Sequence, residues 1–254
     1  MTAATGPAPP LDCTGVTVRF GGFTALEDVT LAFPDGRSTA LIGPNGAGKT
    51  TLLNVLSGRQ APTAGQVRMA GRDVTRLAAA ARARLGLARS FQIISIFPDF
   101  TVFENLRLAA QRHAFRRMPA WRDAAAYAAP RGMAEEVLSR IGLAARRDDR
   151  AGTLSHGEQR AIEIGLALIG DPPVLLLDEP LAGVGTQELP RFLDLLRQVT
   201  AGRTVVLIEH NMEAVMDLAD RIAVLVGGRL LAVGAPAEIR DDARVREAYL
   251  GSEP

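Results

Sequence analysis

Apolar and polar residues alternate along two stretches near the start of the chain. Val16, Val18 and Phe20 keep a period of two, and residues 29–33 repeat it. A period of two places alternate side chains on one face of a strand, so both stretches predict half-buried antiparallel strands. Residues 174–177 and 205–208 are apolar at every position. That pattern is typical of strands in a parallel sheet covered by helices on both sides.

Glycines, caps and helical periodicity predict the other elements. Residues 39–42 predict a strand that runs into a glycine-rich loop, and a helix over 49–57 should follow and end at Gly58. Thr101 and Glu104 form a capping-box pattern that opens another helix. The remaining predicted elements are strands over 67–69 and 222–226 and helices over 101–108, 133–141, 157–169, 187–199 and 211–218. The order predicts one α/β domain with an antiparallel N-terminal portion and an inserted helical portion.

Two segments stand apart from this pattern. Residues 1–10 are rich in Ala, Pro and Thr and lack the charge and apolar regions of a signal peptide, so we expect a flexible tail. Residues 112–131 are basic and rich in Ala and Pro, which favours a helical hairpin or a mobile insertion. Their charges form a solvated face or a contact surface, and Trp121 is expected to be a local packing anchor.

Composition narrows the choice of partners. The 254 residues include 29 basic and 28 acidic side chains, a formal net charge of +1, so no nucleic-acid partner is expected. Cys13 is the only cysteine, which excludes an internal disulfide and a thiolate metal cluster and suits a reducing compartment. No run of about 18 uncharged apolar residues occurs, so we expect any link to a membrane to come through a partner protein.

A phosphate-binding loop lies between the predicted strand 39–42 and the predicted helix 49–57. The matching residues are Gly43, Pro44, Asn45, Gly46, Ala47, Gly48, Lys49 and Thr50. Backbone amides of such a loop, together with the helix N-terminus, surround a polyphosphate. Lys49 is expected to contact the β- and γ-phosphates, and the Thr50 hydroxyl to ligate Mg²⁺. The alternative is a glycine-rich turn that only caps a helix.

Two carboxylates follow the apolar strand 174–177. Asp178 ends that strand and Glu179 comes next, at the edge where parallel sheets bind ligands. Asp178 is suited to hold Mg²⁺, and Glu179 to act as general base on an attacking water. Taken alone, the pair could equally be a solvated Asp-Glu-Pro turn.

These motifs together resemble those of ABC-type ATPases. Leu154-Ser155-His156-Gly157-Glu158-Gln159 looks like the signature sequence of that family, about twenty residues before the acidic pair. Gln92, His210 and Phe20 stand where the family has its Q-loop glutamine, its switch histidine and an aromatic that stacks on adenine. The resemblance covers residues 11–250. Phe20 could also be a core residue, and His210 a polar neighbour of a helix cap.

The resemblance implies a fold, a site and an assembly. The fold is a P-loop NTPase with a RecA-like parallel-sheet core, an antiparallel N-terminal subdomain and a helical subdomain over about 93–168. Ser155 would face the γ-phosphate bound by a second copy, at a helix N-terminus capped by the box of Ser155 and Glu158. The implied catalytic residues are Glu179, His210, Gln92 and Lys49. The implied ATP contacts are Phe20, Gly43, Pro44, Asn45, Gly46, Ala47, Gly48, Lys49, Thr50, Thr51, Ser155 and Gly157. The implied Mg²⁺ ligands are Thr50, Gln92 and Asp178.

The sequence departs from the family pattern at the signature and after the acidic pair. His156 replaces a glycine and Glu158 a glutamine, and a side chain at 156 would crowd the site if the backbone there needed a positive φ. Residues 180–185 lack the aspartate that the family more often has near the end of this loop. We expect the change at His156 to be tolerated, because backbone N–H groups rather than side chains do the binding. The missing aspartate bears on communication between subunits rather than on nucleotide binding.

Several stretches look like the ATP-binding subunit of branched-chain amino-acid importers. They are residues 88–92, 97–98 with 101–105, and 246–251, together with the insertion at 112–131. This implies transmembrane permease subunits, a second ATPase subunit in a homodimer or heterodimer, a solute-binding protein and a place on the cytoplasmic face of the membrane. Importers of urea or short amides carry nearly the same subunit. A soluble ABC ATPase, a P-loop kinase or GTPase and a non-hydrolysing regulator are the rival interpretations.

Overall fold

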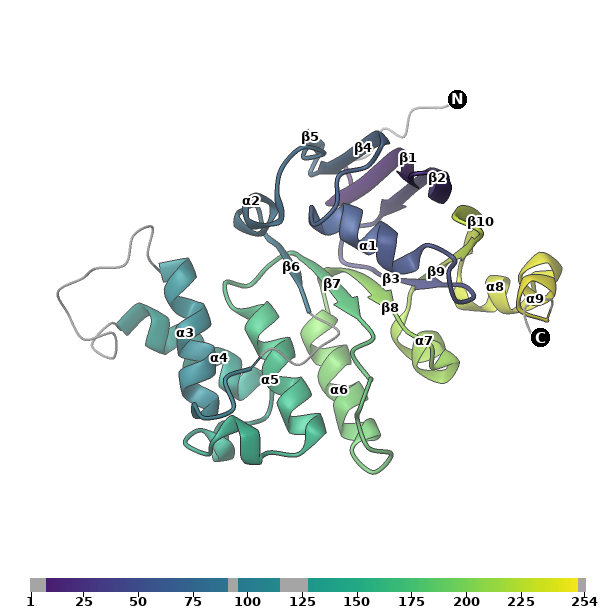
Figure 1. The fold of residues 1–254 in the computed structure, drawn as a ribbon. Coiled ribbons are helices and arrows are strands. Elements are labelled where there is room, and N and C mark those ends of the chain that lie inside the picture. The colour runs from purple at the N-terminus through teal and green to yellow at the C-terminus, as the bar shows by residue number, and fades with distance from the viewer. Residues whose placement is uncertain (1–7, 91–95, 115–127, 251–254) are drawn as a thin grey trace. The chain divides into compact units, whose positions relative to one another are not determined.

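The chain folds into a four-stranded and a six-stranded β-sheet joined by helices (Figure 1). The computed structural model describes residues 8–90, 96–114 and 128–250. The strands are β1 Leu11–Phe20, β2 Phe23–Phe33, β3 Ser38–Ile42, β4 Ala64–Met69, β5 Arg72–Asp73, β6 Leu87–Arg89, β7 Val174–Asp178, β8 Thr204–Ile208, β9 Arg221–Val226 and β10 Arg229–Gly234. The helices are α1 Lys49–Ser57, α2 Ala79–Arg84, α3 Val102–Ala114, α4 Ala128–Arg140, α5 His156–Leu168, α6 Leu189–Thr200, α7 Met212–Leu218, α8 Pro236–Asp241 and α9 Ala243–Leu250.

The four-stranded sheet is antiparallel and has the order β2-β1-β4-β5. β1 is an inner strand, with Cys13 opposite Leu31 of β2 on one side and Val67 of β4 on the other. The apolar side chains that alternate along β1 and β2 are buried, except at the turn between them, where Phe20 is 54% and Phe23 63% exposed. The predicted antiparallel pair is therefore confirmed.

The six-stranded sheet has the order β10-β9-β3-β8-β7-β6. β3 pairs in parallel with both β8 and β9, and β10 pairs antiparallel with β9. Every residue of β3, β7 and β8 is buried, as expected for parallel strands that helices cover. This parallel core is the part of the fold that the uniformly apolar runs predicted.

Two compact units divide the chain. The first comprises the chain up to Leu87, then Pro173–Leu176 and the chain from Gly202 onward. Its main core joins apolar side chains of β1, β2, β3 and β8 to one face of α1, which contributes Leu52, Leu53 and Leu56. Helix α1 is thereby packed against both the antiparallel sheet and the parallel strands of this unit (Figure 1). The helix follows the phosphate loop, so this core fixes the direction in which its N-terminus points.

A buried arginine closes the other end of α1. Arg82 of α2 is 0% exposed, and its guanidinium donates to the carbonyls of Val55 (2.7 Å) and Leu56 (2.8 Å) in the last turn of α1. It also donates to the carbonyls of Leu77 and Thr75, each at 3.0 Å. The last carbonyls of a helix lack partners within the helix, so Arg82 supplies both hydrogen bonds and a favourable charge there.

The second unit comprises Ala88–Pro172 and Leu177–Ala201 and contains α3 to α6. The described parts of the predicted helical portion, residues 96–114 and 128–168, belong to it. Helix α3 packs against α4 and α5, and α5 packs against α6. The capping box that opens α3 is present, with the Glu104 amide donating to Thr101 Oγ1 (3.1 Å) and the Thr101 amide donating to Glu104 Oε2 (2.8 Å).

The predicted bounds of α3 and α4 were too short. Helix α3 continues to Ala114 instead of ending at 108, and α4 begins at Ala128 instead of 133. Pro130 lies in the first turn of α4, where the missing N–H has no partner to lose, so a proline there does not interrupt the helix. Residues 115–127, including Trp121, lie outside the described residues. Among the residues described, no helix is long and apolar enough to cross a membrane.

Candidate nucleotide site

The phosphate loop joins β3 to α1 within the first unit. Gly43 has a φ of 148°, and a Cβ built there would lie 2.0 Å from the carbonyl oxygen of Leu225. Only glycine fits this position without moving the β9 backbone. The loop is also tied to the β9–β10 turn, since the Gly228 amide donates to the Ala47 carbonyl at 3.2 Å. The conformation of the loop therefore depends on its contacts with β9 and the β9–β10 turn as well as on its own glycines.

The features of a phosphate cradle gather at the start of α1. The N-cap residue is Gly48, and the first turn, Lys49-Thr50-Thr51, contains no acidic side chain. The helix therefore presents backbone amides and the positive end of its dipole without a competing carboxylate from that turn. Lys49 is 7% exposed, and its ammonium donates to the carbonyls of Gly43 (2.7 Å) and Pro44 (3.0 Å). This geometry suits a polyanion.

The loop after β8 carries His210. Glu209 is 6% exposed, and its carboxylate accepts from the His210 amide (3.0 Å) and from the Asn211 amide (3.5 Å). The Asn211 side chain in turn caps α7 by accepting from the Ala214 amide at 3.0 Å. These bonds fix the backbone on both sides of His210, whose side chain is exposed. Nothing in the sequence distinguishes Glu209 beyond its position next to His210.

The acidic pair lies in the second unit, at the end of β7. Asp178 is 3% exposed, and its carboxylate accepts from Arg89 Nη2 at 2.9 Å. Its backbone amide donates to Ser90 Oγ at 3.3 Å. Arg89 and Ser90 belong to the segment that precedes Gln92, but Gln92 itself lies outside the described residues.

Glu179 adopts an unusual backbone conformation. Its φ is +48°, a left-handed geometry that non-glycine residues seldom adopt and that is often found at functional sites. The carbonyls of Glu179 and Pro180 accept from Arg160 of α5, at 2.6 and 3.1 Å. Arg160 forms a buried ion pair with Glu163, one turn further along the helix.

Helix α5 begins at the signature residues. Ser155 is its N-cap, and the predicted capping box is present: the Glu158 amide donates to Ser155 Oγ (3.2 Å) and the Ser155 amide to Glu158 Oε2 (3.1 Å). His156 is the first helical residue, so the left-handed backbone that would make its side chain intrude is not adopted there. Ser155 Oγ also donates to Glu188 Oε1 at 2.6 Å. A Cβ built on Gly157 would lie 2.7 Å from Glu188 Oε2.

The predicted residues thus fall into two groups. Within the first unit the structure places the phosphate loop at the start of α1, His210 after β8, and Phe20 exposed at the end of β1. Within the second it places Asp178 at the end of β7, Glu179 directly after it, and Ser155 and Gly157 at the start of α5. The residues that sequence reasoning missed are Arg89, Arg160, Glu163, Glu188 and Glu209. The one available signal was a pair of opposite charges, Arg160 and Glu163, three residues apart on an otherwise apolar helix segment.

The side-chain oxygens of Thr50, in the first unit, and Asp178, in the second, are each of a kind that a magnesium ion accepts. Among the described residues, no group of three or more His, Cys, Asp or Glu side chains could form a protein-only metal site. Mg²⁺ commonly takes one or two protein oxygen ligands and fills its other positions with water and phosphate oxygens. A carboxylate at Asp178 and a hydroxyl at Thr50 are ligands of that kind.

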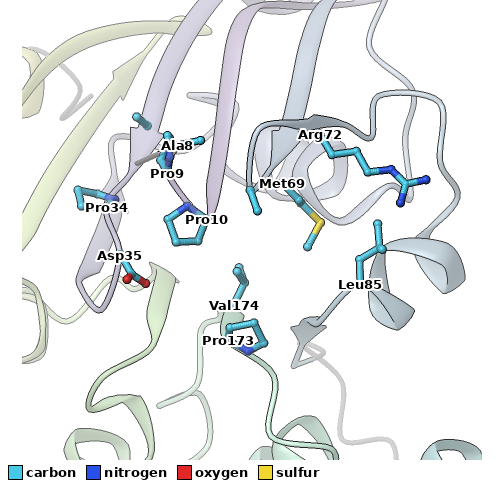
Figure 2. Close-up of a pocket in the computed structure, with 12 residues that line it drawn as sticks. Ala8, Pro9, Pro10, Pro34, Asp35, Met69, Arg72, Leu85, Pro173 and Val174 are labelled. Atoms are coloured by element: carbon cyan, nitrogen blue, oxygen red, sulfur yellow. The ribbon is translucent and has the colours of Figure 1, made fainter. Parts of the chain in front are cut away.

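An apolar pocket of about 820 Å³ lies elsewhere in the first unit (Figure 2). Pro9, Pro10 and Met69 line one part of it, and Leu85 and Pro173 another. Its lining contains none of the predicted nucleotide-site residues. We therefore do not assign it to the nucleotide.

Comparisons with known proteins agree with the motifs. Residues 26–182 match the family model described as ABC transporter, and residues 229–254 match the model described as branched-chain amino acid ATP-binding cassette transporter. The high-affinity branched-chain amino acid transport ATP-binding protein BraF of Pseudomonas aeruginosa is 38% identical over 258 residues, which cover 96% of this chain and 98% of BraF. The corresponding protein LivG of Escherichia coli is 38% identical over 253 residues, with the same two coverages.

Solved structures give the same answer for the fold. A nucleotide-free ATP-binding cassette from an ABC transporter matches with a TM-score of 0.81 at 29% identity, covering 94% of this chain and 98% of that chain. An ATP-binding cassette solved in its ADP conformation matches with a TM-score of 0.80 at 29% identity, covering 95% of this chain and 98% of that chain. The α/β fold inferred from the sequence is therefore confirmed.

Proposed function

The chain belongs to the ABC transporter family, and on that premise we propose that it is the ATP-hydrolysing subunit of an importer for branched-chain or other hydrophobic amino acids. The observation that carries the amino-acid assignment is the combination of near full-length similarity to BraF and LivG with the separate C-terminal match over 229–254. Importers of urea or short amides are the second candidate, because they carry nearly the same ATP-binding subunit.

Nucleotide binding is assigned to the phosphate loop. The loop over residues 43–51, through the Lys49 ammonium and every backbone N–H except that of Pro44, which has none, holds the phosphates, and Phe20 stacks on the adenine. The exposed ring of Phe20 supports this role, because a core phenylalanine would not be accessible. Bound Mg²⁺ would neutralise phosphate charge during transfer, with Thr50, Asp178 and Gln92 as its proposed ligands. Gln92 is assigned by its place in the sequence alone.

Hydrolysis is assigned to Glu179 and His210. Glu179 accepts a proton from the attacking water, and His210 holds that water and the γ-phosphate in line. The left-handed backbone at Glu179 supports the assignment, because such a conformation persists where surrounding bonds enforce it. The buried Glu209, which fixes the amides of residues 210 and 211, supports a fixed position for His210.

The active form is proposed to be a dimer of ATPase subunits. Ser155 and the amides near Gly157 close over the γ-phosphate held by the second subunit, which is either another copy or a related ATPase. Permease subunits carry the pair at the cytoplasmic face of the membrane, and a solute-binding protein delivers the cargo. The capped N-terminus of α5 supports the proposed contact between Ser155 and the γ-phosphate of the second subunit, because a helix N-terminus presents backbone amides to an anion.

Substitution of the proposed base tests the mechanism. Glu179→Gln is expected to keep ATP binding, to nearly abolish turnover and to accumulate an ATP-bound dimer, measured by nucleotide binding, phosphate release and gel filtration. Lys49→Ala is the matched variant that loses most nucleotide affinity. Turnover of the Glu179→Gln chain at the wild-type rate would refute the assignment of the base.

A pull-down from membranes tests the transport role. The tagged chain should co-purify with a multi-spanning permease, and ligand screening of the associated solute-binding protein should identify a hydrophobic amino acid. Recovery of the chain without any membrane protein would favour the soluble ABC ATPase instead. Binding of urea or an amide would select the second candidate.

A further inference from the structure

Helix α5 contains a buried ion pair that the proposed mechanism does not use. Arg160 and Glu163 have side chains that are 2% and 4% exposed, and they contact each other one turn apart. Charged side chains at this depth are costly to bury unless every polar group finds a partner. Glu163 satisfies one edge of the guanidinium, and the rest of it faces the loop that follows β7.

The remaining guanidinium bonds reach the backbone of the acidic pair. Arg160 Nη2 donates to the Glu179 carbonyl at 2.6 Å, and Nε donates to the Pro180 carbonyl at 3.1 Å. A guanidinium is planar with its donors in fixed directions, so two bonds to successive carbonyls set the orientation of the peptide between them. That peptide follows the residue whose φ is +48°.

We infer that Arg160, oriented by Glu163, is a positioning residue that holds the Glu179 backbone in its left-handed conformation and so aims the Glu179 carboxylate. The inference rests on the proposed role of Glu179 as the base. A general base acts only within hydrogen-bond reach of the proton it removes, so a small rotation of this peptide lowers the rate without removing the carboxylate.

A merely structural ion pair would behave differently. Losing it would lower stability and activity together, and its effect would be the same whether or not Glu179 is present. A positioning role predicts a loss in kcat with little change in the KM for ATP, and this loss should disappear when Glu179 no longer acts as a base.

The experiment compares conservative variants in the ATPase assembled with its co-purified permease. Arg160→Lys keeps the charge but loses the planar fork, and Glu163→Gln keeps the shape but loses the charge that orients Arg160. Each is expected to lower kcat by about tenfold or more, with KM and ATP binding changed by less than about twofold. Arg197→Lys is the matched control, because Arg197 and Asp194 form an exposed pair at the same spacing on α6.

Repeating the measurement in the Glu179→Gln variant distinguishes a positioning role of Arg160 from a merely structural one. Adding Arg160→Lys to Glu179→Gln should not lower the residual single-turnover rate further. An equal loss in both backgrounds, or a wild-type kcat in both folded single variants, would overturn the inference. If Arg160→Lys fails to fold, the effect of Glu163→Gln on the rate, measured with and without Glu179→Gln, tests the inference in its place. A wild-type rate in Glu179→Gln itself would instead count against the proposed base.

Discussion

The cap that Arg82 places on α1 should be a large contributor to stability. Arg82→Met keeps most of the apolar stem but removes a guanidinium that is 0% exposed and bonded to the carbonyls of Val55, Leu56, Leu77 and Thr75. A hydrogen bond from a charged donor contributes about 1.5–3 kcal/mol, but bonds from one group do not add independently. Each buried carbonyl left without a donor costs about 1–3 kcal/mol, and relaxation of the four keeps these costs from adding in full, so we expect a loss of about 4 kcal/mol. For a protein of this size that corresponds to a fall in Tm of roughly 8–16 °C.

The measurement needs a control on the same helix. Arg84 of α2 is exposed, so Arg84→Met removes the same chemical group without uncovering buried carbonyls, and it should change the free energy of unfolding by less than about 0.5 kcal/mol. Thermal and denaturant unfolding, followed by circular dichroism without nucleotide, compares the two variants. An Arg82→Met chain as stable as Arg84→Met would refute the reasoning, because the bonds in the structure would then contribute nothing net.

Three further predictions concern separate parts of the chain. Gly43→Ala should weaken ATP binding by at least about tenfold in an equilibrium binding assay, because its Cβ would lie 2.0 Å from the Leu225 carbonyl and displace the loop; wild-type affinity would contradict this. Glu188→Gln should increase the ATP-bound dimer seen by gel filtration, because it removes a carboxylate that is bonded to Ser155 and would repel an incoming phosphate; an unchanged dimer fraction would argue against that competition. Burial raises the pKa of the Cys13 thiol to about 12, so at about pH 8 only about one thiol in 10⁴ ionises, and a thiol reagent should label the chain about a thousandfold more slowly when folded than when unfolded. Since thiolate rises with pH below this pKa, labelling of the folded chain should accelerate from pH 7 to 9, and rapid labelling at neutral pH would show that the thiol is accessible.

Elements with local signals were predicted closely. The bounds of α1 agree because a glycine-rich loop precedes it and Gly58, with a positive φ, ends it. The capping boxes that begin at Thr101 and Ser155 were predicted correctly, because each depends on two residues only three positions apart. The parallel core was readable because its strands are apolar on both faces.

Features that depend on distant residues were not predicted. Arg160 and Glu163 have the spacing of an exposed surface pair, and their burial follows from the carbonyls that the loop at 179–180 brings to them. Strand β10 was missed because its place in the sheet comes from pairing with β9, and its side chains are mostly half-buried. Helix α2 is six residues long, too short for an apolar period to be recognised, and its buried residue is Arg82.

The turn between β9 and β10 looks like a suitable insertion site from the sequence, but its contacts in the fold make it a poor one. Gly227 is exposed at the tip of a two-residue hairpin turn, where an epitope tag or a fluorescent domain would ordinarily be inserted. Its neighbour Gly228, however, bonds to Ala47 of the phosphate loop and accepts from the Glu27 amide at 2.8 Å. A fusion at this hairpin would weaken the contact that holds the phosphate loop, although residues 47 and 227 are 180 positions apart in the chain. The loop's glycines and this hairpin therefore have to be altered, or left alone, together.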